Sequence, residues 1–176
     1  MKKGDEMIKK LTVTIAVLAA MSAMLSAKEK SLIYMSVASY QQIVVRDKKG
    51  HIQKDKNGKP VKKWVKASKV VPGYVVKYVD VIHNDSNTTL KNATVANPID
   101  PNLLFIADSA KSDANMSVTY SVNKGKSFDT ADKLMVLGTD KKMHPARPKD
   151  YNAISFTINK VPAHSKVEIS YKVKLK

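Results

Sequence analysis

Strict alternation of polar and apolar residues in the C-terminal segment 166–175 constrains the fold more than any other feature of this chain. Five apolar residues occupy every second position, and lysine, glutamate and serine fill the positions between them. The apolar set is Val167, Ile169, Tyr171, Val173 and Leu175. A period of two places these side chains on one face of an extended strand and does not match the 3.6-residue period of a helix. The segment therefore predicts a β-strand with one buried and one solvated face.

Similar stripes recur along the chain. Ile154, Phe156 and Ile158 form one, and a second runs over residues 116–122 and ends at an Asn-Lys-Gly turn. Segments rich in β-branched and aromatic residues predict further strands near residues 31–46, 61–71, 74–83, 89–96, 102–107 and 133–137. No amphipathic helix pattern follows residue 27. Short strands with one polar face each predict an all-β fold, in which two antiparallel sheets of about seven to nine strands in total pack face to face.

The N-terminus has the pattern of a secretory signal peptide. Four lysines within the first ten residues precede the uncharged run 11–27, which ends in small residues. We expect cleavage after Ala27, with cleavage after Ser22 or Ala23 as the alternative. An uncleaved anchor is the rival interpretation, although 17 residues are marginal for crossing about 30 Å of hydrocarbon. The prediction is an exported protein of the bacterial periplasm or cell surface, with residues 28–176 forming one domain.

Charge and cysteine content limit the chemistry. The chain has no cysteine, so a packed core rather than disulfides must hold the domain together. Without the expected signal peptide the net charge is +14, and 29 of the 31 basic residues of the full chain are lysine. Lysine is a solvated point charge, whereas arginine provides forked phosphate contacts. The excess therefore favours diffuse attraction to polyanions or simple solubility. With few aromatic residues and no recognisable motif, nucleic acid is not an expected partner.

Much of this charge lies in the segment 46–69, which carries ten basic and two acidic residues. Asn57-Gly58 is a tight-turn signal, so the segment predicts a long basic hairpin inserted at a sheet edge. One interpretation is a contact with an anionic glycan or lipid surface, with the tryptophan as an anchor. The contact residues would be Lys48, Lys49, Lys54, Lys56, Lys59, Lys62, Lys63, Trp64 and Lys66. The other interpretation is a solvated edge hairpin whose lysines oppose aggregation. The later segment 138–150, with two prolines, predicts an irregular loop.

Residues 65–175 resemble the bacterial DUF11-type conserved repeat domain. The resemblance rests on Val-Pro-Gly before the strand VVKYVDVIHN, on the polar turn NDSNTT, and on the following strand LKNATV. It continues in the hairpin SVTYSVNKGKSFD and in the closing strands of residues 150–175. The resemblance implies an immunoglobulin-like β-sandwich of an exported or surface protein, and it implies no activity. Asn97 stands where aspartate is common in the family.

Candidate sites are few. Asp80 interrupts an apolar strand face, and we expect it to point to a sheet edge or to a lysine, because a lone buried carboxylate is unstable. The four histidines lack zinc-ligand spacing, and the acidic residues near residue 100 lack calcium-loop spacing. No nucleophile motif appears, so we expect no catalytic residues, no metal and no cofactor. Asn87 and Asn115 lie in acidic Asn-x-Ser/Thr contexts and are candidate glycosylation sites.

These observations favour a non-enzymatic module of the bacterial cell envelope, with a structural role or a role in binding a protein or glycan. A ligand-binding module is the alternative, holding carbohydrate or calcium in the loops at one end of the sandwich. We expect a monomer whose partner is an envelope protein or an anionic glycan or lipid surface.

Overall fold

The computed structural model describes residues 32–176. The expected signal peptide, residues 1–27, lies outside this part. The described residues form eleven β-strands and a single turn of 3-10 helix, η1 (Pro148–Asp150). Every strand pair is antiparallel. The prediction of an all-β antiparallel fold is therefore confirmed. Within the same residues, no helix has the length and apolar character needed to cross a membrane.

The larger sheet has the strand order β2-β1-β3-β11-β5, and the short β6 also pairs with β11. Its strands are β1 (Ile33–Val44), β2 (Lys62–Lys66), β3 (Val75–Asn84), β5 (Leu103–Phe105), β6 (Lys111–Ser112) and β11 (Ser165–Leu175). The register aligns Tyr78 of β3 with Ser39 of β1 and with Tyr171 of β11. Even-numbered residues of β3 therefore share the inner face with odd-numbered residues of β1 and β11, because directly paired residues point the same way.

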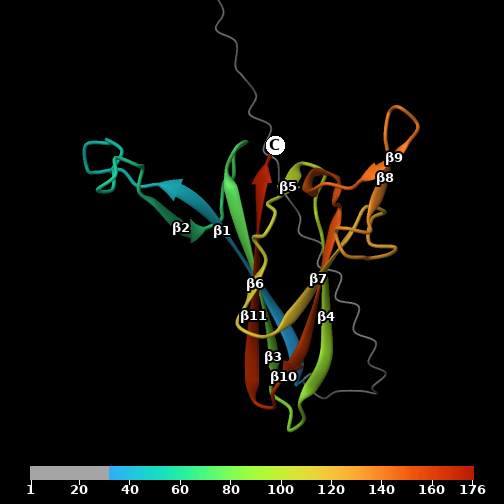
Figure 1. Ribbon diagram of the computed structural model, residues 1–176. Coiled ribbons are helices and arrows are strands. Elements are labelled where there is room, and N and C mark those ends of the chain that lie inside the picture. The colour runs from blue at the N-terminus through green and yellow to red at the C-terminus, as the bar shows by residue number, and fades with distance from the viewer. Residues whose placement is uncertain (1–31) are drawn as a thin grey trace, which may run out of the picture.

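The smaller sheet has three strands in the order β4-β10-β7. They are β4 (Leu90–Pro98), β7 (Met116–Ser121) and β10 (Ala153–Val161). A separate two-stranded hairpin joins β8 (Met135–Leu137) to β9 (Met143–Pro145). Figure 1 shows the two main sheets side by side, with the β1–β2 hairpin and the β8–β9 hairpin diverging at the end that carries the C-terminus.

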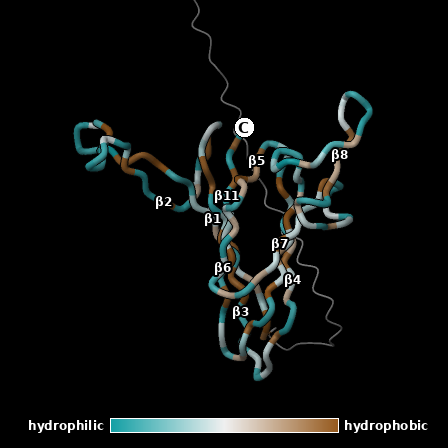
Figure 2. Tube along the Cα trace, in the orientation of Figure 1, coloured by the Kyte–Doolittle hydropathy of each residue, from teal (hydrophilic) through white to brown (hydrophobic). Residues whose placement is uncertain are grey.

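The core lies between the two main sheets. Ile154, Phe156 and Ile158 on β10 are completely buried, and the alternating apolar residues of β11 are 0–5% exposed. The Phe156 ring meets the Tyr171 ring from the opposite sheet, with centroids 5.5 Å apart. Burying one such large side chain is worth about 1.5–3 kcal/mol, so this contact region is the main source of stability. The apolar stripes predicted at 154–158 and 166–175 are confirmed as core faces, and Figure 2 shows hydrophobic residues concentrated along the strands.

Asn84 closes the end of the core opposite the C-terminus. This residue is fully buried at the end of β3. Its Nδ2 donates hydrogen bonds to the carbonyl oxygens of Thr88 (2.8 Å), Val161 (3.0 Å) and Pro162 (2.8 Å). One amide group thus ties the β3–β4 turn to the end of β10 and the β10–β11 turn, and it donates to their carbonyl groups in a buried setting.

The segment 138–150 is not the irregular loop that its prolines suggested. Leu137 pairs with Met143 and Met135 pairs with Pro145 across a tight turn, and Pro148 begins η1. The prediction was wrong because proline is compatible with a strand edge and with the first turn of a helix, where its missing N–H is not needed.

Candidate functional site

The outward face of the larger sheet gathers aromatic rings and lysines from four strands. Lys66 of β2 pairs with Tyr40 of β1, Tyr40 pairs with Lys77 of β3, and Lys77 pairs with Lys172 of β11. These residues therefore form a row across the sheet with about 5 Å between neighbouring strands. Trp64 lies two residues before Lys66 on the same side of β2. We call Tyr40, Trp64, Lys66, Lys77, Lys172 and Lys174 the aromatic–lysine face.

The rings of this face hold the lysine ammonium groups. Lys77 Nζ lies 5.3 Å from the centroid of Tyr40 and 5.5 Å from that of Trp64. Lys172 Nζ approaches the Trp64 ring from β11 at 5.8 Å. These distances fall within the range of cation–π attraction, which is worth about 0.5–1 kcal/mol at exposed sites. Both ammonium groups are thereby oriented by neutral aromatic partners.

Few carboxylates neutralise the lysines of the described residues, and none forms an ion pair with a lysine of the aromatic–lysine face. Within residues 32–176, one lysine forms an ion pair with a carboxylate, Lys133 with Asp129 at 3.8 Å, and it lies outside the aromatic–lysine face. The other ion pairs of this region involve histidines. A positive surface held by aromatic rings rather than by acidic side chains attracts an anionic partner without first having to break internal salt bridges.

The predicted contact lysines separate into two groups in the structure. Lys62, Trp64 and Lys66 lie on the outward side of β2, whereas Lys63 points to its opposite side. The remaining five project from residues 45–61, which we call the finger. They are Lys48, Lys49, Lys54, Lys56 and Lys59, and all are exposed. Sequence reasoning missed Lys77 and Lys172, because only the pairing of β3 with β1 and β11 brings them to Trp64.

The finger is a junction of three short antiparallel arms rather than one continuous hairpin. Val45 N donates to Val61 O (2.9 Å), Gln53 N to Val45 O (2.9 Å), and Val61 N to Gln53 O (2.8 Å). These three residues are spaced eight apart, and their hydrogen bonds close a ring. Asn57-Gly58 does form a turn, as predicted, but this turn caps one of two loops, each with a glycine at positive φ.

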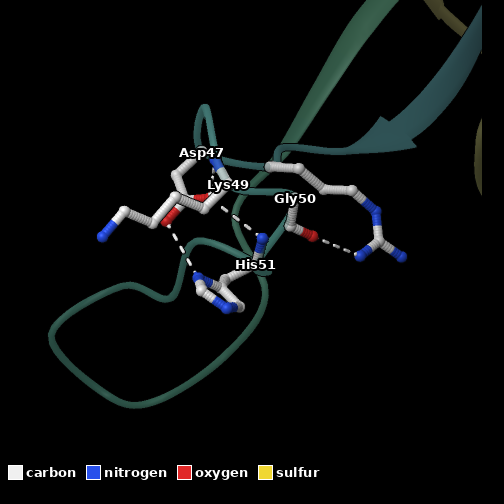
Figure 3. Close-up of polar contacts among 5 residues, drawn as sticks. Asp47, Lys49, Gly50 and His51 are labelled. Atoms are coloured by element: carbon white, nitrogen blue, oxygen red, sulfur yellow. Dashed lines mark hydrogen bonds and ion pairs between the residues drawn. The ribbon is translucent and has the colours of Figure 1, made fainter.

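An aspartate organises each loop of the finger. Asp47 Oδ1 accepts hydrogen bonds from the backbone N–H groups of Lys49 (2.8 Å) and His51 (2.9 Å), and Figure 3 shows this loop. Asp55 repeats the arrangement eight residues later. The hydrogen bond from the His51 N–H favours the ionised carboxylate and lowers the pKa of Asp47 below its ordinary value. The repeated Asp-Lys-x-Gly pattern was a visible signal for this structure. The finger therefore presents its lysines on a defined scaffold.

Asp80 occupies a different position from the one expected. Its side chain is 1% exposed, on the central strand β3 and facing the core. Its partner is Asn97 of β4, whose Nδ2 donates to Asp80 Oδ2 at 2.6 Å across the two sheets. Burial raises the pKa of Asp80 to about 6, and the hydrogen bond from Asn97 partly opposes this. The expectation of a sheet edge or a lysine partner was wrong, because an amide donor satisfies the carboxyl group instead.

Elsewhere the structure brings one histidine and one carboxylate together. His144 Nε2 lies 2.8 and 3.0 Å from the two carboxylate oxygens of Asp140, beside a shallow depression of about 530 Å³. The lining of the depression includes Thr139 but no serine or cysteine. Both groups are half exposed and four residues apart in one turn, so the pair acts as a clasp of the β8–β9 turn.

Metal-ligating groups do not cluster in the described part of the chain: no three His, Cys, Asp or Glu residues there are placed to hold an ion. Asp113 accepts a hydrogen bond from the backbone N–H of Glu168 at 2.9 Å, which is a structural contact between the β6–β7 turn and β11.

The two candidate glycosylation sites lie in exposed turns. Asn87 follows β3, and its Oδ1 lies 2.8 Å from His164 Nε2. Asn115 immediately precedes β7 and is also exposed. The neighbouring triplet at Asn84 has a different character, because that side chain is buried and fully engaged.

Comparison of the chain with protein-family models, with curated proteins and with solved structures gave no match. The site is therefore interpreted from its own geometry.

Proposed function

We propose that the protein is a non-enzymatic, exported immunoglobulin-like β-sandwich module of the bacterial cell envelope that binds an anionic glycan through the aromatic–lysine face. The observation that carries this proposal is the pair of ammonium groups, Lys77 and Lys172, placed over Trp64 at 5.5 and 5.8 Å. Two facing antiparallel sheets and the resemblance of residues 65–175 to the DUF11-type domain support the architecture. The basic N-terminus with its apolar run supports export.

An extended polymer fits this face better than a small ligand does. The lysines form a row across the strands on an open sheet surface, and Lys174 adds a charge two residues beyond Lys172 on β11. Adjacent charges in the row lie about 5–10 Å apart, comparable with the spacing of acidic groups along a polysaccharide or a phosphodiester-linked wall polymer. A polymer contacts several such charges at once and gains affinity from their sum. The chemistry recognised is thus a repeating anionic group on an exported glycan.

Trp64 provides the assay, because it is the single tryptophan of the chain. Titration with polygalacturonate is expected to change its fluorescence, whereas neutral dextran leaves it unchanged. The binding constant should fall steeply between 50 and 500 mM salt, because exposed charges are screened over about 10 Å at 0.1 M. Lys77→Gln and Lys172→Gln should each weaken binding about two- to fivefold.

The matched control is Lys160→Gln, which removes the same charge from an exposed position on β10 of the other sheet. If this control weakens binding as much as Lys77→Gln, the attraction is a property of net charge and the proposed face is wrong. Binding that does not change with salt also contradicts the proposal.

A further inference from the structure

The β8–β9 hairpin is anchored firmly at its base. Leu134 and Ala146 flank the hairpin, are buried at 8% and 9% exposure, and are joined by a hydrogen bond from Ala146 N to Leu134 O of 2.8 Å. Val136 on β8 packs against the same core. One face of the hairpin is therefore fixed to the domain, which leaves the other face directed outward.

That outward face is apolar. Cross-strand pairing places Leu137 opposite Met143 and Met135 opposite Pro145, on the side away from Val136. Leu137 is 69% exposed, Met143 is 56% exposed and Met135 is 40% exposed. Isolated exposed apolar residues are common, but a paired set on a projecting hairpin forms a contiguous patch of the kind that marks a contact surface. We call these four residues the apolar hairpin face.

The turn above this face is closed by side-chain hydrogen bonds and carries two exposed lysines. The Asp140 carboxylate forms hydrogen bonds with His144 Nε2 and with the backbone N–H of Lys142 (3.1 Å). Its negative charge is therefore directed to partners within the turn. Gly138 makes room for this clasp, since a Cβ there would lie 2.6 Å from both Asp140 Oδ1 and His144 Cδ2. Lys141 and Lys142 are exposed at the tip of the hairpin, next to the paired Leu137 and Met143. An apolar patch bordered by lysines suits the interface of a bilayer, where chains enter the lipid and ammonium groups stay at the headgroups.

The finger lies at the same end of the molecule. Figure 1 shows the finger and the β8–β9 hairpin projecting on either side of the C-terminus, away from the β3–β4 turn. The finger contributes its five exposed lysines, together with Ile52 at 42% exposure. Because both basic projections lie at one end, a flat anionic surface can contact the two of them at the same time. A compact protein bound to the hairpin would contact only one.

We propose that this end of the protein docks on a bilayer containing anionic lipid, with Leu137 and Met143 entering the headgroup–acyl boundary. The lysines of the hairpin tip and of the finger supply the attraction to the lipid headgroups, and the apolar hairpin face supplies the insertion. The aromatic–lysine face takes no part in this contact, so the two proposals stand or fall separately.

Vesicle binding tests the proposal. The protein is recovered after export from a bacterial host, so that every variant carries the same processed N-terminus, and is mixed with vesicles of phosphatidylcholine with or without phosphatidylglycerol. Binding is expected only with phosphatidylglycerol present. Leu137→Ser combined with Met143→Ser should reduce the partition coefficient about tenfold or more, because two apolar side chains no longer enter the lipid. Lys141→Gln with Lys142→Gln should reduce it about tenfold as well.

Leu32→Ser is the matched control, because Leu32 is also an exposed leucine, at 51% exposure, before β1. It should change the partition coefficient less than twofold. The chain has no cysteine, so Met143→Cys gives a single site for an environment-sensitive dye. The dye should shift to shorter wavelength on phosphatidylglycerol vesicles, while the same dye on Leu32→Cys should not.

Three outcomes would overturn the proposal. The first is the absence of vesicle binding at low salt. The second is vesicle binding that the Leu137/Met143 double substitution leaves unchanged. Binding would then come from electrostatic attraction to the headgroups alone, without insertion of these side chains into the lipid. The third is a dye at position 143 that responds to an envelope protein fraction and not to vesicles, which would assign the apolar hairpin face to a protein partner. Circular dichroism melts of each variant verify that the fold is retained.

Discussion

Replacing Asp80 by asparagine tests whether the core holds a carboxyl group that favours its neutral form. Burial raises the pKa of Asp80 from 3.8 to about 6, against the opposing effect of the Asn97 hydrogen bond. The folded state therefore binds this proton more tightly than the unfolded chain does. The stability contributed by the protonated group is fully present below about pH 4 and is lost as the pH rises through about 6.

The magnitude follows from the two pKa values. Their difference is about two pKa units, and each unit corresponds to 1.36 kcal/mol, so ionised Asp80 costs about 3 kcal/mol at pH 7.5. Asparagine has nearly the same shape, does not ionise, and keeps an oxygen that can accept from Asn97. The free energy of unfolding of Asp80→Asn is therefore expected to exceed that of the wild type by up to about 3 kcal/mol at pH 7.5. At pH 4 the two free energies of unfolding should be nearly equal.

Urea unfolding followed by far-ultraviolet circular dichroism at several values between pH 4 and 8 measures this difference. The control Asp108→Asn removes an exposed carboxylate at a φ of 56°, which asparagine tolerates, and it should show no such pH-dependent gain. A wild type that is more stable than Asp80→Asn at pH 7.5 would refute the reasoning. An advantage of equal size at pH 4 and 7.5 would do the same, because the effect could not then come from ionisation.

Three further substitutions probe the scaffold. Phe156→Ala should lower the free energy of unfolding by about 3–5 kcal/mol in urea titrations, because a fully buried ring between the sheets leaves a cavity; a loss below about 1 kcal/mol would contradict this packing. Asn84→Ala should cost about 2–3 kcal/mol in the same assay, since buried carbonyl groups lose their donor, and an unchanged midpoint would show that water replaces the amide. Gly138→Ala should displace the Asp140–His144 clasp and speed hydrogen exchange at the Lys142 amide, while global stability changes by less than about 1 kcal/mol; unaltered exchange would mean that the turn does not depend on the clasp.

Local pattern was sufficient for the strands and their buried faces. In residues 166–175 the alternation alone identified which side chains enter the core, because a period of two leaves one face for water and one for packing. The same reasoning identified the stripe at 154–158. It placed a strand near 133–137, where β8 lies, but it missed β9, because a three-residue strand is too short for a periodic signal and this one is stabilised by a side-chain clasp in the turn.

The candidate site depended on pairing between distant segments. The sequence singled out Trp64 and the lysines around it, since charge density is a local property. Lys77 and Lys172 lie far from Trp64 in the chain and reach it only because β1, β3 and β11 are neighbours in one sheet. Asp80 shows the same limit: its sequence position predicted a sheet edge or a lysine partner, and only the packing of β4 against β3 supplied the Asn97 amide. The sequence by itself determined which apolar residues are buried in the long strands and where positive charge accumulates. The tertiary structure decided which of those residues meet, because strand order and register are set by long-range packing that no local pattern encodes.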